Sequence, residues 1–271
     1  MDNIKTTRVT LCADDYAQNE GIDLAVRQLL DMGRLSAVSC FSTSPRWQDA
    51  AAPALREHIG QADMGLHFNL TEGFAKTSMP GLHAVILRSL LRCINSTRLR
   101  QELQRQLNAF EAGFGQPPDF IDGHQHVHQL PGVRKIVLEV IQDRYPGHPV
   151  WVRNTVPADA QWRGKALILK YLGGSALAVD LQAARIASNN GFGGVYGFDQ
   201  EDYAACFKIW LKVATEGMLI MCHPGTAPYP NDAIARQRVI EYHFFRSQQC
   251  GDMLDAAGVK LARLSQIAMA N

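Results

Sequence analysis

The sequence predicts an α/β fold, namely a parallel (βα) barrel of seven or eight strands that is distorted or incompletely closed. Short apolar runs alternate with amphipathic stretches along the whole chain, which is typical of a parallel sheet. The length of 271 residues suits one barrel domain. We therefore expect a single domain over residues 1–271 with a helical insertion at about 83–113. A doubly wound open sheet is the second choice.

Composition narrows the class of protein. Hydrophobic residues make up 46% and charged residues 20% of the chain, as in ordinary globular domains. The net charge of +1 argues against a nucleic-acid partner bound through bulk charge. The six cysteines form no Cys-x-x-Cys pair, so buried thiols are expected in place of disulfides. Without an apolar segment near residue 1 or a run of about 18 apolar residues, we expect a cytoplasmic protein.

The first elements follow from periodicity. Residues 8–13 form a short apolar run and predict the first strand. Residues 19–30 place their apolar side chains on one face and end before a glycine, which predicts a helix. Residues 37–41 and 63–70 predict the second and third strands. Residues 47–58 predict a second helix, interrupted by a proline.

The middle of the chain continues this alternation. After a turn-rich loop, residues 83–94 and 97–113 predict two helices. Residues 118–122 predict the fourth strand and 150–153 the fifth. The amphipathic segment 133–143 predicts the helix between them.

The last part contains two predicted strands, a glycine-rich segment and four predicted helices. The apolar run 218–222 predicts a fully buried strand, and residues 259–264 predict a short final one. The glycine-rich segment 190–197 lacks the strand and helix of a dinucleotide fingerprint and is interpreted as a flexible loop over the site. Four further helices are expected, at 165–172, 176–189, 201–215 and 232–257.

A histidine-rich segment follows the fourth predicted strand. Asp122 is followed by His124, His126 and His128 at every second position. Imidazoles beside a carboxylate are suited to a divalent cation. Alternate spacing would put all three rings on one side if the chain stayed extended. The alternative is a polar loop whose histidines only donate and accept hydrogen bonds.

Other polar residues stand at the ends of predicted strands. In a parallel barrel all strand C-termini open on one face, so these side chains should converge in an active site. Each residue has a structural alternative: Asp15 could cap a helix, His67 could be a core histidine, Arg153 could pair at the surface and His223 could belong to a turn. The residues so placed are Asp14, Asp15, His67, Asp122, His124, Arg153 and His223.

Together these segments resemble the YdjC-like carbohydrate deacetylases (the ChbG/HpnK group). The resemblance extends from the first strand to Pro224 and departs from the family pattern at Tyr16, Ala17 and Gln125. It is carried by Ala-Asp-Asp-Tyr at 13–16, Gly-Leu-His-Phe-Asn-Leu-Thr at 65–71, Met-Pro-Gly-Leu at 79–82, Asp-Gly-His-Gln-His-Val-His at 122–128, Gly-Phe at 191–192, Tyr-Gly at 196–197 and Cys-His-Pro at 222–224.

The resemblance implies a barrel-like fold, a divalent metal ion and removal of acetyl groups from N-acetylated amino sugars. The substrate would be a lipid-linked sugar or a chito-oligosaccharide. Carried over by motif, the metal ligands would be Asp15, His67 and His124, and Asp14 would be the general base. Mixed oxygen and nitrogen ligands suit Mg, Zn, Co or Mn alike. By analogy with the wider polysaccharide deacetylases, His223 would be the general acid.

Supporting roles complete the predicted site. Arg153 is expected to lie against Asp14 and keep it ionised, because an adjacent cation lowers the pKa of a carboxyl group. His126 and His128 would orient ligands or contact sugar hydroxyls. The family motifs add Asn69, Phe192 and Tyr196 as expected substrate contacts.

Rival functions use the same residues. The ligand set could serve a phosphoesterase or a different amidohydrolase. A non-catalytic sugar-binding protein is a further alternative, although the pair Asp14–Asp15 argues against it because sensing needs no general base. The oligomeric state stays open, with a homodimer as one option.

Two basic and apolar stretches predict peripheral contact with the inner face of a membrane. Residues 83–110 carry five arginines against the single acid Glu102, interleaved with leucine and isoleucine. Residues 163–172 mix Arg163, Lys165 and Lys170 with apolar side chains. The alternative is that the apolar sides face the barrel and the arginines are simply solvated. The arginines of the first stretch are Arg88, Arg92, Arg98, Arg100 and Arg105.

Overall fold

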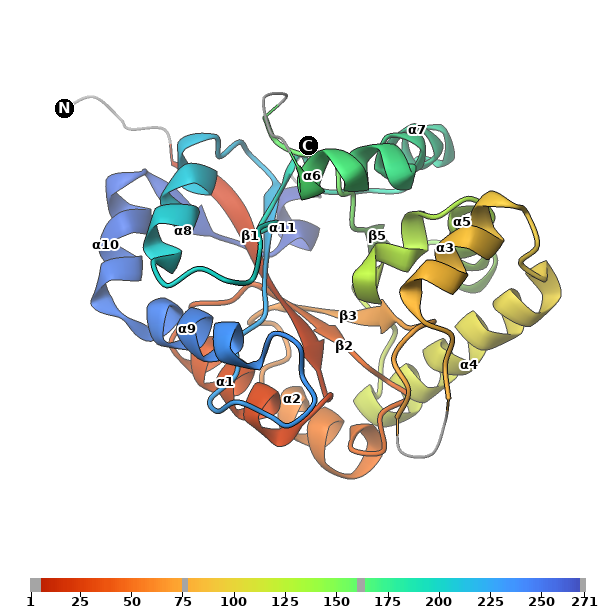
Figure 1. Ribbon diagram of the computed structural model, residues 1–271, viewed down its shortest axis with the longest axis horizontal. Helices are drawn as coiled ribbons and strands as arrows, with labels where there is room; N and C mark the ends of the chain where they lie inside the picture. Colours follow the sequence, from red (N-terminus) through yellow and green to blue (C-terminus); the bar gives the residue numbers. More distant parts are fainter. Residues whose placement is uncertain (1–5, 75–77, 160–163, 269–271) are drawn as a thin grey trace.

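A parallel sheet forms the centre of the protein (Figure 1). The computed structural model describes residues 6–74, 78–159 and 164–268. The strands follow the order β5-β4-β3-β2-β1-β7-β6, and β8 pairs with β1 beside this path. Their bounds are β1 Thr7–Tyr16, β2 Ala37–Cys40, β3 Asp63–Phe68, β4 Phe120–Gly123, β5 Trp151–Val152, β6 Phe192–Gly193, β7 Met218–Cys222 and β8 Val259–Leu261.

The sheet curls into a barrel that is incompletely closed. All seven strand pairings are parallel. Between β5 and β6, the two ends of the path, the described residues form only isolated bridges, such as Val152 to Ser188 and Pro157 to Phe192. The predicted fold class is therefore confirmed.

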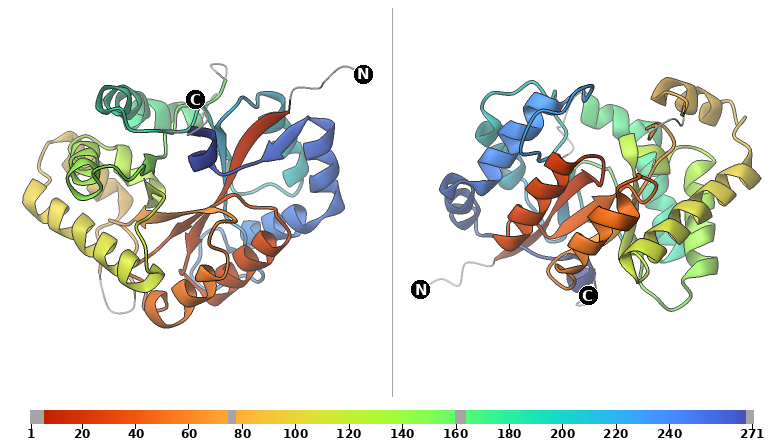
Figure 2. Two further views of the ribbon diagram at one scale, coloured as in Figure 1. Left: turned by 180° about the vertical axis from the view of Figure 1, so that it is seen from behind. Right: turned by 90° about the horizontal axis from the view of Figure 1, so that it is seen from below.

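Helices surround the outside of the sheet (Figure 2). Capping residues set where some of these helices begin and end. The side chain of Asn19 accepts a hydrogen bond from the backbone N–H of Ile22 at the start of α1. Gly115 ends α4 in the left-handed region. The bounds are α1 Glu20–Asp31, α2 Ala52–Arg56, α3 Leu82–Leu90, α4 Ser96–Phe114, α5 Val133–Arg144, α6 Lys165–Leu169, α7 Ser175–Ala184, α8 Tyr203–Lys212, α9 Ala235–Arg246, α10 Gln248–Ala256 and α11 Leu264–Ala268.

Four predicted helices are divided or joined differently from the prediction. The helix expected at 232–257 is two helices, because extended Ser247 ends α9 and its hydroxyl oxygen accepts from the N–H of Cys250 to cap α10. The helix expected at 47–58 begins as the π-helical turn η1 (Trp47–Ala51) and continues as α2. The expected pair at 165–172 and 176–189 is likewise joined by a π-helical turn, η3 (Lys170–Gly174).

The segment expected as a helical insertion contains two helices with different surroundings. Helix α4 packs against β3 and α5, in the position of the crossover between β3 and β4. Helix α3 instead packs against the turn after β4. The part of the chain that the structure describes contains no helix both long and apolar enough to cross a bilayer.

The glycine-rich segment 190–197 is not simply a flexible loop, which corrects the prediction. Phe192 and Gly193 form β6 and pair with Leu219 and Ile220 of β7. This segment can lie close to β7 because Gly193 and Gly194 carry no side chain. An added Cβ at Gly194 would lie 2.2 Å from the carbonyl oxygen of Met221.

The interior of the barrel is a second hydrophobic core, separate from the one between sheet and helices. The large rings of Phe120 and Trp151 stack there with centroids 4.1 Å apart. Gly65 on β3 faces them, and a Cβ at this position would lie 2.4 Å from the Phe120 ring. The two aromatic rings therefore fit inside the barrel only because the neighbouring strand β3 has a glycine at this position.

We expect Gly65→Ala to lower the free energy of unfolding by about 1–3 kcal/mol, because the buried Phe120 ring has no space to move into. Gly81→Ala is the matched control, since nothing lies within 4 Å of its Cβ position. Urea unfolding followed by circular dichroism measures both. Equal stability of the two variants would contradict this account of the interior.

Candidate active site

The aspartate pair ends β1 in an irregular backbone. Asp15 and Ala17 adopt left-handed φ values of 66° and 75°, and the pairing of β1 with β2 shifts register between Ala13 and Tyr16. Such bulges redirect side chains at the ends of strands. As a result Asp14 contacts the buried Arg153, whereas Asp15 contacts two histidines from β3 and from the turn after β4.

Asp15, His67 and His124, here called the triad, converge on one point. The Oδ1 of Asp15 lies 3.3 Å from Nε2 of His67 and 3.1 Å from Nδ1 of His124. One ligand atom from each of the three residues lies within 4.8 Å of the other two. A carboxylate and two imidazoles are a common donor set for divalent cations.

His67 is held in the orientation that a ligand needs. Its Nδ1 lies 2.7 Å from Oδ1 of Asp122, which leaves Nε2 directed at Asp15. The hydroxyl of Ser39 donates to the same Asp122 oxygen at 2.5 Å. Metal-binding histidines commonly donate their second ring N–H to a carboxylate in this way. The triad therefore fits a divalent cation in orientation as well as in composition.

Arg153 lies at the end of β5, fully buried beneath the triad. Its guanidinium makes two contacts with Asp14, at 2.7 and 2.5 Å, and one with Asp122 at 2.6 Å. Burial by itself would raise the pKa of Asp14, but Arg153 outweighs this effect and holds that pKa below its usual range. The expected contact between Arg153 and Asp14 is thus present.

A second group of potential ligands is already filled by this guanidinium. Cys12, Asp14 and Asp122 also lie within ligand distance of one another. The Nη2 of Arg153 is 3.1 Å from the Cys12 sulfur and 2.5 and 2.6 Å from the two carboxylates. A cation placed there would meet the positive charge of Arg153, so this group does not suit a metal ion.

His223 follows β7 and lies on the other side of Asp14. Its Nε2 is 3.8 Å from Oδ2 of Asp14, and its ring packs edge-on against Phe198. Burial lowers the pKa of His223 to about 4. The imidazole is therefore neutral near pH 7, with one ring nitrogen facing the aspartate.

Helix α9 supplies two buried charged residues that were not predicted. Arg238 donates to Oδ2 of Asp15 at 2.7 Å, and Glu241 accepts the backbone N–H of His223 at 2.5 Å. Burial raises the pKa of Glu241 to about 7. Their spacing of three residues on the buried side of an amphipathic helix was the available signal. It was hidden within the single long helix expected at 232–257.

The histidine-rich segment does not stay extended, which corrects the prediction that its three rings share one side. Residues His124–Gln129 form the 3₁₀ turn η2, with left-handed φ values of 52° at Gln125 and 60° at His126. The turn directs His124 to Asp15, while His126 packs edge-on against Phe192. The Nε2 of the buried His128 lies 2.9 Å from the Arg153 carbonyl oxygen.

These residues surround a cavity of about 540 Å³, here called the active-site cavity. This volume is within the usual range for a small-molecule site. Of the predicted site residues, the lining includes Asp14, Asp15, His67, His124, His126, Tyr196 and His223.

The other predicted substrate residues lie elsewhere. Asn69 lines a neighbouring cavity, where its side chain hydrogen-bonds to the backbone of Thr71 and Glu72. Phe192 is 1% exposed and His128 is fully buried, and neither lines the active-site cavity. In this structure His128 contacts the backbone of Arg153, and Phe192 packs against the ring of His126.

Fold and site together define an α/β protein of the incomplete-barrel type with a carboxylate–histidine site at the C-terminal ends of its strands. Residues 8–256 match the sequence profile of the family described as YdjC-like protein. The chain belongs to this family, as the motifs indicated.

Two relatives are similar in sequence to about half of this chain. A chitooligosaccharide deacetylase of Serratia marcescens is 34% identical over 133 residues, which is 46% of this chain and 52% of the relative. A carbohydrate deacetylase of Homo sapiens is 30% identical over 149 residues, 50% of this chain and 45% of the relative. The chain thus spans about half the length of the curated relatives it matches.

Among the solved structures with a similar fold is one that aligns with nearly the whole chain. It comes from Enterococcus faecalis V583 and is assigned provisionally to cellobiose-phosphate cleavage. The TM-score is 0.72 at 16% identity, with 97% of this chain and 99% of that chain covered. At this identity the match supports the fold.

We expect Asp15→Ala, His67→Ala and His124→Ala each to abolish stoichiometric binding of a divalent cation, because each removes one of the three candidate ligands. The measurement is elemental analysis after chelation and reloading. His148→Ala is the control, since this exposed histidine does not belong to the triad and does not line the active-site cavity. Full metal content in any of the three triad variants would remove that residue from the ligand set.

Proposed function

We propose that the protein is a metal-dependent hydrolase that removes the N-acetyl group from an N-acetylated amino sugar and releases acetate. One observation carries this proposal: the triad, Asp14 and His223 line the same cavity. The names of the Serratia and human relatives support a carbohydrate deacetylase. A lipid-linked sugar and a chito-oligosaccharide are the two candidate substrates.

The proposed cofactor is one divalent cation held by Asp15, His67 and His124. Mg, Zn, Co and Mn all accept such mixed oxygen and nitrogen ligands. When bound, the ion would polarise the amide carbonyl and lower the pKa of water. Other side chains hold the proposed ligands in position. Asp122 holds His67, and Arg238 holds Asp15.

Asp14 is the proposed general base. It borders the triad without belonging to it, and Arg153 keeps its carboxylate ionised at neutral pH. Its Oδ2 is 3.8 Å from Nε2 of His223, and Asp14 lines the active-site cavity. This carboxylate is therefore available to accept a proton from the attacking water.

His223 is the proposed general acid, which protonates the nitrogen of the departing amine. Because burial favours its neutral form, the imidazole must gain a proton during the reaction. Asp14, 3.8 Å away, can pass on the proton that it takes from water. Glu241 supports this role by holding the backbone of His223.

Tyr196 and His126 are the proposed sugar contacts within the active-site cavity. The hydroxyl of Tyr196 donates to Glu241, so its ring edge is fixed beside the cavity. His126 is half-buried and lines the same cavity, and a ring nitrogen of histidine can donate to or accept from a sugar hydroxyl.

We expect Asp14→Asn to retain the cation but to lower kcat by roughly 10² to 10⁴-fold, since the base is lost while the ligands remain. His223→Ala should also retain the cation, with the largest rate loss on substrates whose amine is a poor leaving group. Single-turnover rates and elemental analysis test both variants. Loss of the ion from either one would make that residue a ligand and would overturn its proposed role.

The function itself is tested by acetate release from N-acetylglucosamine oligomers, before and after chelation. A deacetylase releases acetate only with the cation present. A phosphoesterase would instead release phosphate from a phosphorylated sugar, and a sugar-binding protein would bind the oligomer without releasing acetate. Either result would replace the proposal.

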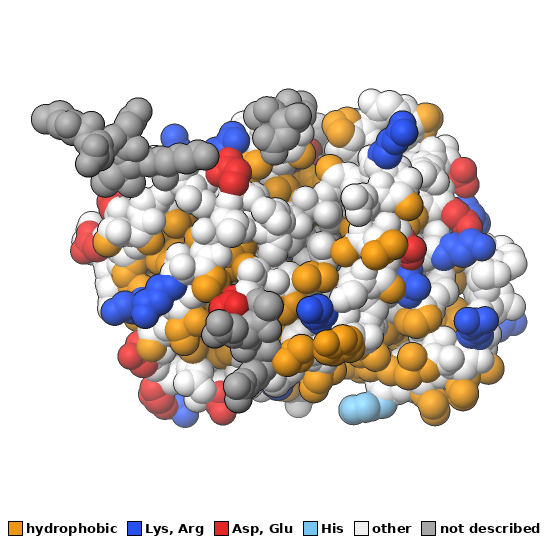
Figure 3. Space-filling model, turned by 90° about the horizontal axis from the view of Figure 1, so that it is seen from above, with side chains coloured by type: hydrophobic (Ala, Val, Ile, Leu, Met, Phe, Trp, Pro, Cys, Tyr) orange, Lys and Arg blue, Asp and Glu red, His pale blue; other side chains and the backbone are white. Residues whose placement is uncertain are grey.

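We also propose peripheral contact with an anionic bilayer. Leu87 and Leu90 of α3 and Leu91, which directly follows the helix, are 58%, 55% and 63% exposed, so this side of the helix does not face the barrel. Across the active-site cavity, Ile168 and Tyr171 are 62% and 76% exposed. Figure 3, which looks onto the face that carries α6 and α7, shows hydrophobic side chains with Lys and Arg among them.

Basic side chains on the same elements complete this surface. They are Arg88 and Arg92 beside the leucines and Lys165 and Lys170 beside Ile168 and Tyr171. Arg163, also expected here, lies outside the described residues. Exposed apolar side chains with interleaved cations are suited to the boundary of an anionic membrane.

We expect the protein to float with vesicles containing anionic lipid at low salt, and to dissociate as salt screens the attraction. Leu87→Ser/Leu91→Ser should weaken flotation, because it removes apolar area from the contact. The control Ile209→Ser removes an equally exposed residue, 56% exposed, from helix α8. An absence of flotation of the wild type at low salt would end the membrane proposal.

A further inference from the structure

The alternation of side chains along β1 does not by itself direct Asp15 to the histidines. Ala13 packs in the core between sheet and helices, whereas its neighbour Cys12 packs in the barrel interior. Asp14 continues the Cys12 side and contacts Arg153 inside the barrel. Successive residues of a regular strand point to opposite faces, so Asp15 would point outward with Ala13.

The backbone changes direction after Asp14. Asp15 and Ala17 have left-handed φ values of 66° and 75°, and the pairing of β1 with β2 shifts register over the same residues. Oδ1 of Asp15 consequently lies 3.3 Å from Nε2 of His67. Left-handed backbone is unfavourable for a residue with a Cβ, so it persists only where surrounding contacts impose it.

The second left-handed residue belongs to a tight turn. The backbone N–H of Gln18 donates to the carbonyl oxygen of Asp15 at 3.0 Å, which makes Ala17 the third of four turn residues. A turn whose third residue is left-handed usually has glycine there. Alanine at this position therefore requires support from outside the turn.

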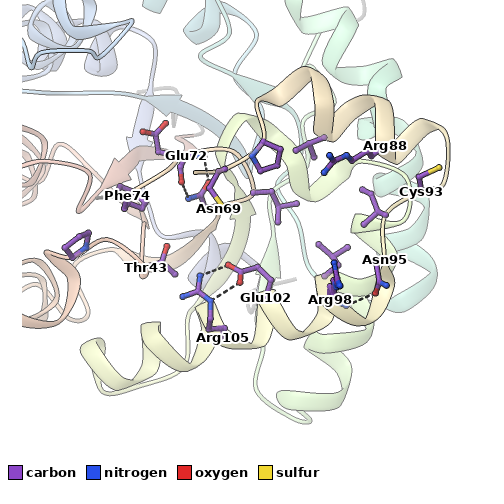
Figure 4. A pocket seen from close by; sticks show the side chains of 17 residues that line it. Thr43, Asn69, Glu72, Phe74, Arg88, Cys93, Asn95, Arg98, Glu102 and Arg105 are labelled. Atoms are coloured by element: carbon purple, nitrogen blue, oxygen red, sulfur yellow. Dashed lines mark hydrogen bonds and ion pairs between the residues drawn. The ribbon is translucent and has the colours of Figure 1, made fainter. Parts of the chain in front are cut away.

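Two buried side chains hold both polar groups of the Ala17 backbone. Oδ1 of Asp23, from α1, accepts its N–H at 2.7 Å. The hydroxyl of Ser44, from the segment between β2 and η1, donates to its carbonyl oxygen at 2.6 Å. The preceding residue Thr43 lines the neighbouring cavity (Figure 4), whereas Ser44 faces Ala17. Breaking either bond would leave a buried polar group unsatisfied.

Arg46 connects these two supports. Its Nε and Nη2 donate to Oδ2 of Asp23 at 3.2 and 2.9 Å, so the other oxygen of Asp23 is left for Ala17. Its backbone N–H donates to the hydroxyl oxygen of Ser44 at 3.2 Å. Asp23, Ser44 and Arg46 form one network, here called the Ala17 clamp. None of the three lines the active-site cavity.

We propose that Asp23 and Ser44 are positioning residues for the candidate ligand Asp15. They act through the backbone of Ala17 and have no direct part in the chemistry. The inference rests on the proposed metal-dependent function and extends its machinery to residues outside the cavity. Without the clamp, the backbone relaxes toward a regular strand, in which Asp15 points away from His67.

The first test measures Zn²⁺ affinity by titration calorimetry. Asp23→Ala should weaken binding about 10- to 100-fold, as for other residues that orient metal ligands. Ser44→Ala should weaken it by a smaller factor, because one of the two hydrogen bonds to Ala17 remains. Asp202→Ala is the control, since Asp202 likewise accepts a backbone N–H but lines neither the active-site cavity nor its neighbour.

Wild-type Zn²⁺ affinity in both clamp variants, with native circular dichroism, would overturn the proposal. Lower thermal stability together with unchanged affinity would have the same meaning, because the clamp would then serve folding alone.

The second test restores the turn without the clamp. Glycine adopts left-handed backbone freely, so Ala17→Gly/Asp23→Ala should recover most of the affinity that Asp23→Ala loses. Ala13→Gly/Asp23→Ala is the control, because Ala13 of the same strand is not left-handed and glycine there should restore nothing. Equal affinity of the two double variants would show that the clamp does not act through the left-handed turn, and would overturn the proposal.

The positioning role and the proposed deacetylase fail in different ways. Zn²⁺ binding that depends on the clamp, without acetate release from N-acetylglucosamine oligomers, would end the deacetylase and leave the positioning role standing. Acetate release by an Asp23→Ala variant with wild-type Zn²⁺ affinity would end the positioning role and leave the deacetylase intact.

Discussion

The candidate site depends on one buried cation, the Arg153 guanidinium. It contacts the carboxylates of Asp14 and Asp122, and all three side chains are shielded from solvent. Buried charges are tolerated only when they are paired and hydrogen-bonded. Removal of the guanidinium would leave two carboxylates without compensation, which typically costs about 3–5 kcal/mol for a broken buried pair. The charge state of Asp14 and the orientation of His67 therefore both depend on this residue.

A series of contacts that begins at Arg153 and Asp122 fixes the orientation of the triad. Asp122 holds Nδ1 of His67, and the other nitrogen of His67 faces Asp15. Asp15 is in turn held by Arg238 from helix α9, whose guanidinium also contacts Asp232. The triad is thus fixed from two sides, by the barrel interior and by an outer helix. Such support is what keeps metal ligands in a productive geometry.

The active-site cavity and the cavity beside it are built from different parts of the fold. The active-site cavity is built on strand ends and on buried charges, where side chains have little freedom. The neighbouring cavity, which Asn69 and Glu72 line, is built on α3, α4 and connecting segments, and its lining side chains range from buried to exposed. Chemistry on a barrel scaffold with specificity supplied by added segments is a common arrangement.

The sequence by itself determined the barrel and the kinds of residue at its strand ends, because burial imposes a periodicity and parallel strands share one open face. It also determined the site of the triad residues Asp15, His67 and His124, through their position after apolar runs. Only the tertiary structure decided how the histidine-rich segment turns, since the left-handed residues Gln125 and His126 reverse an apparently extended pattern.

The tertiary structure alone also brought Arg238 and Glu241 to the site, because a helix near the C-terminus packs beside the first strand's end. The same holds for Ser39. Nothing in the sequence marks this serine, but in the folded protein its hydroxyl contacts both His67 and Asp122. Local patterns encode which residues are buried. Contacts between residues more than 200 positions apart, such as that of Arg238 with Asp15, arise only when the sheet closes.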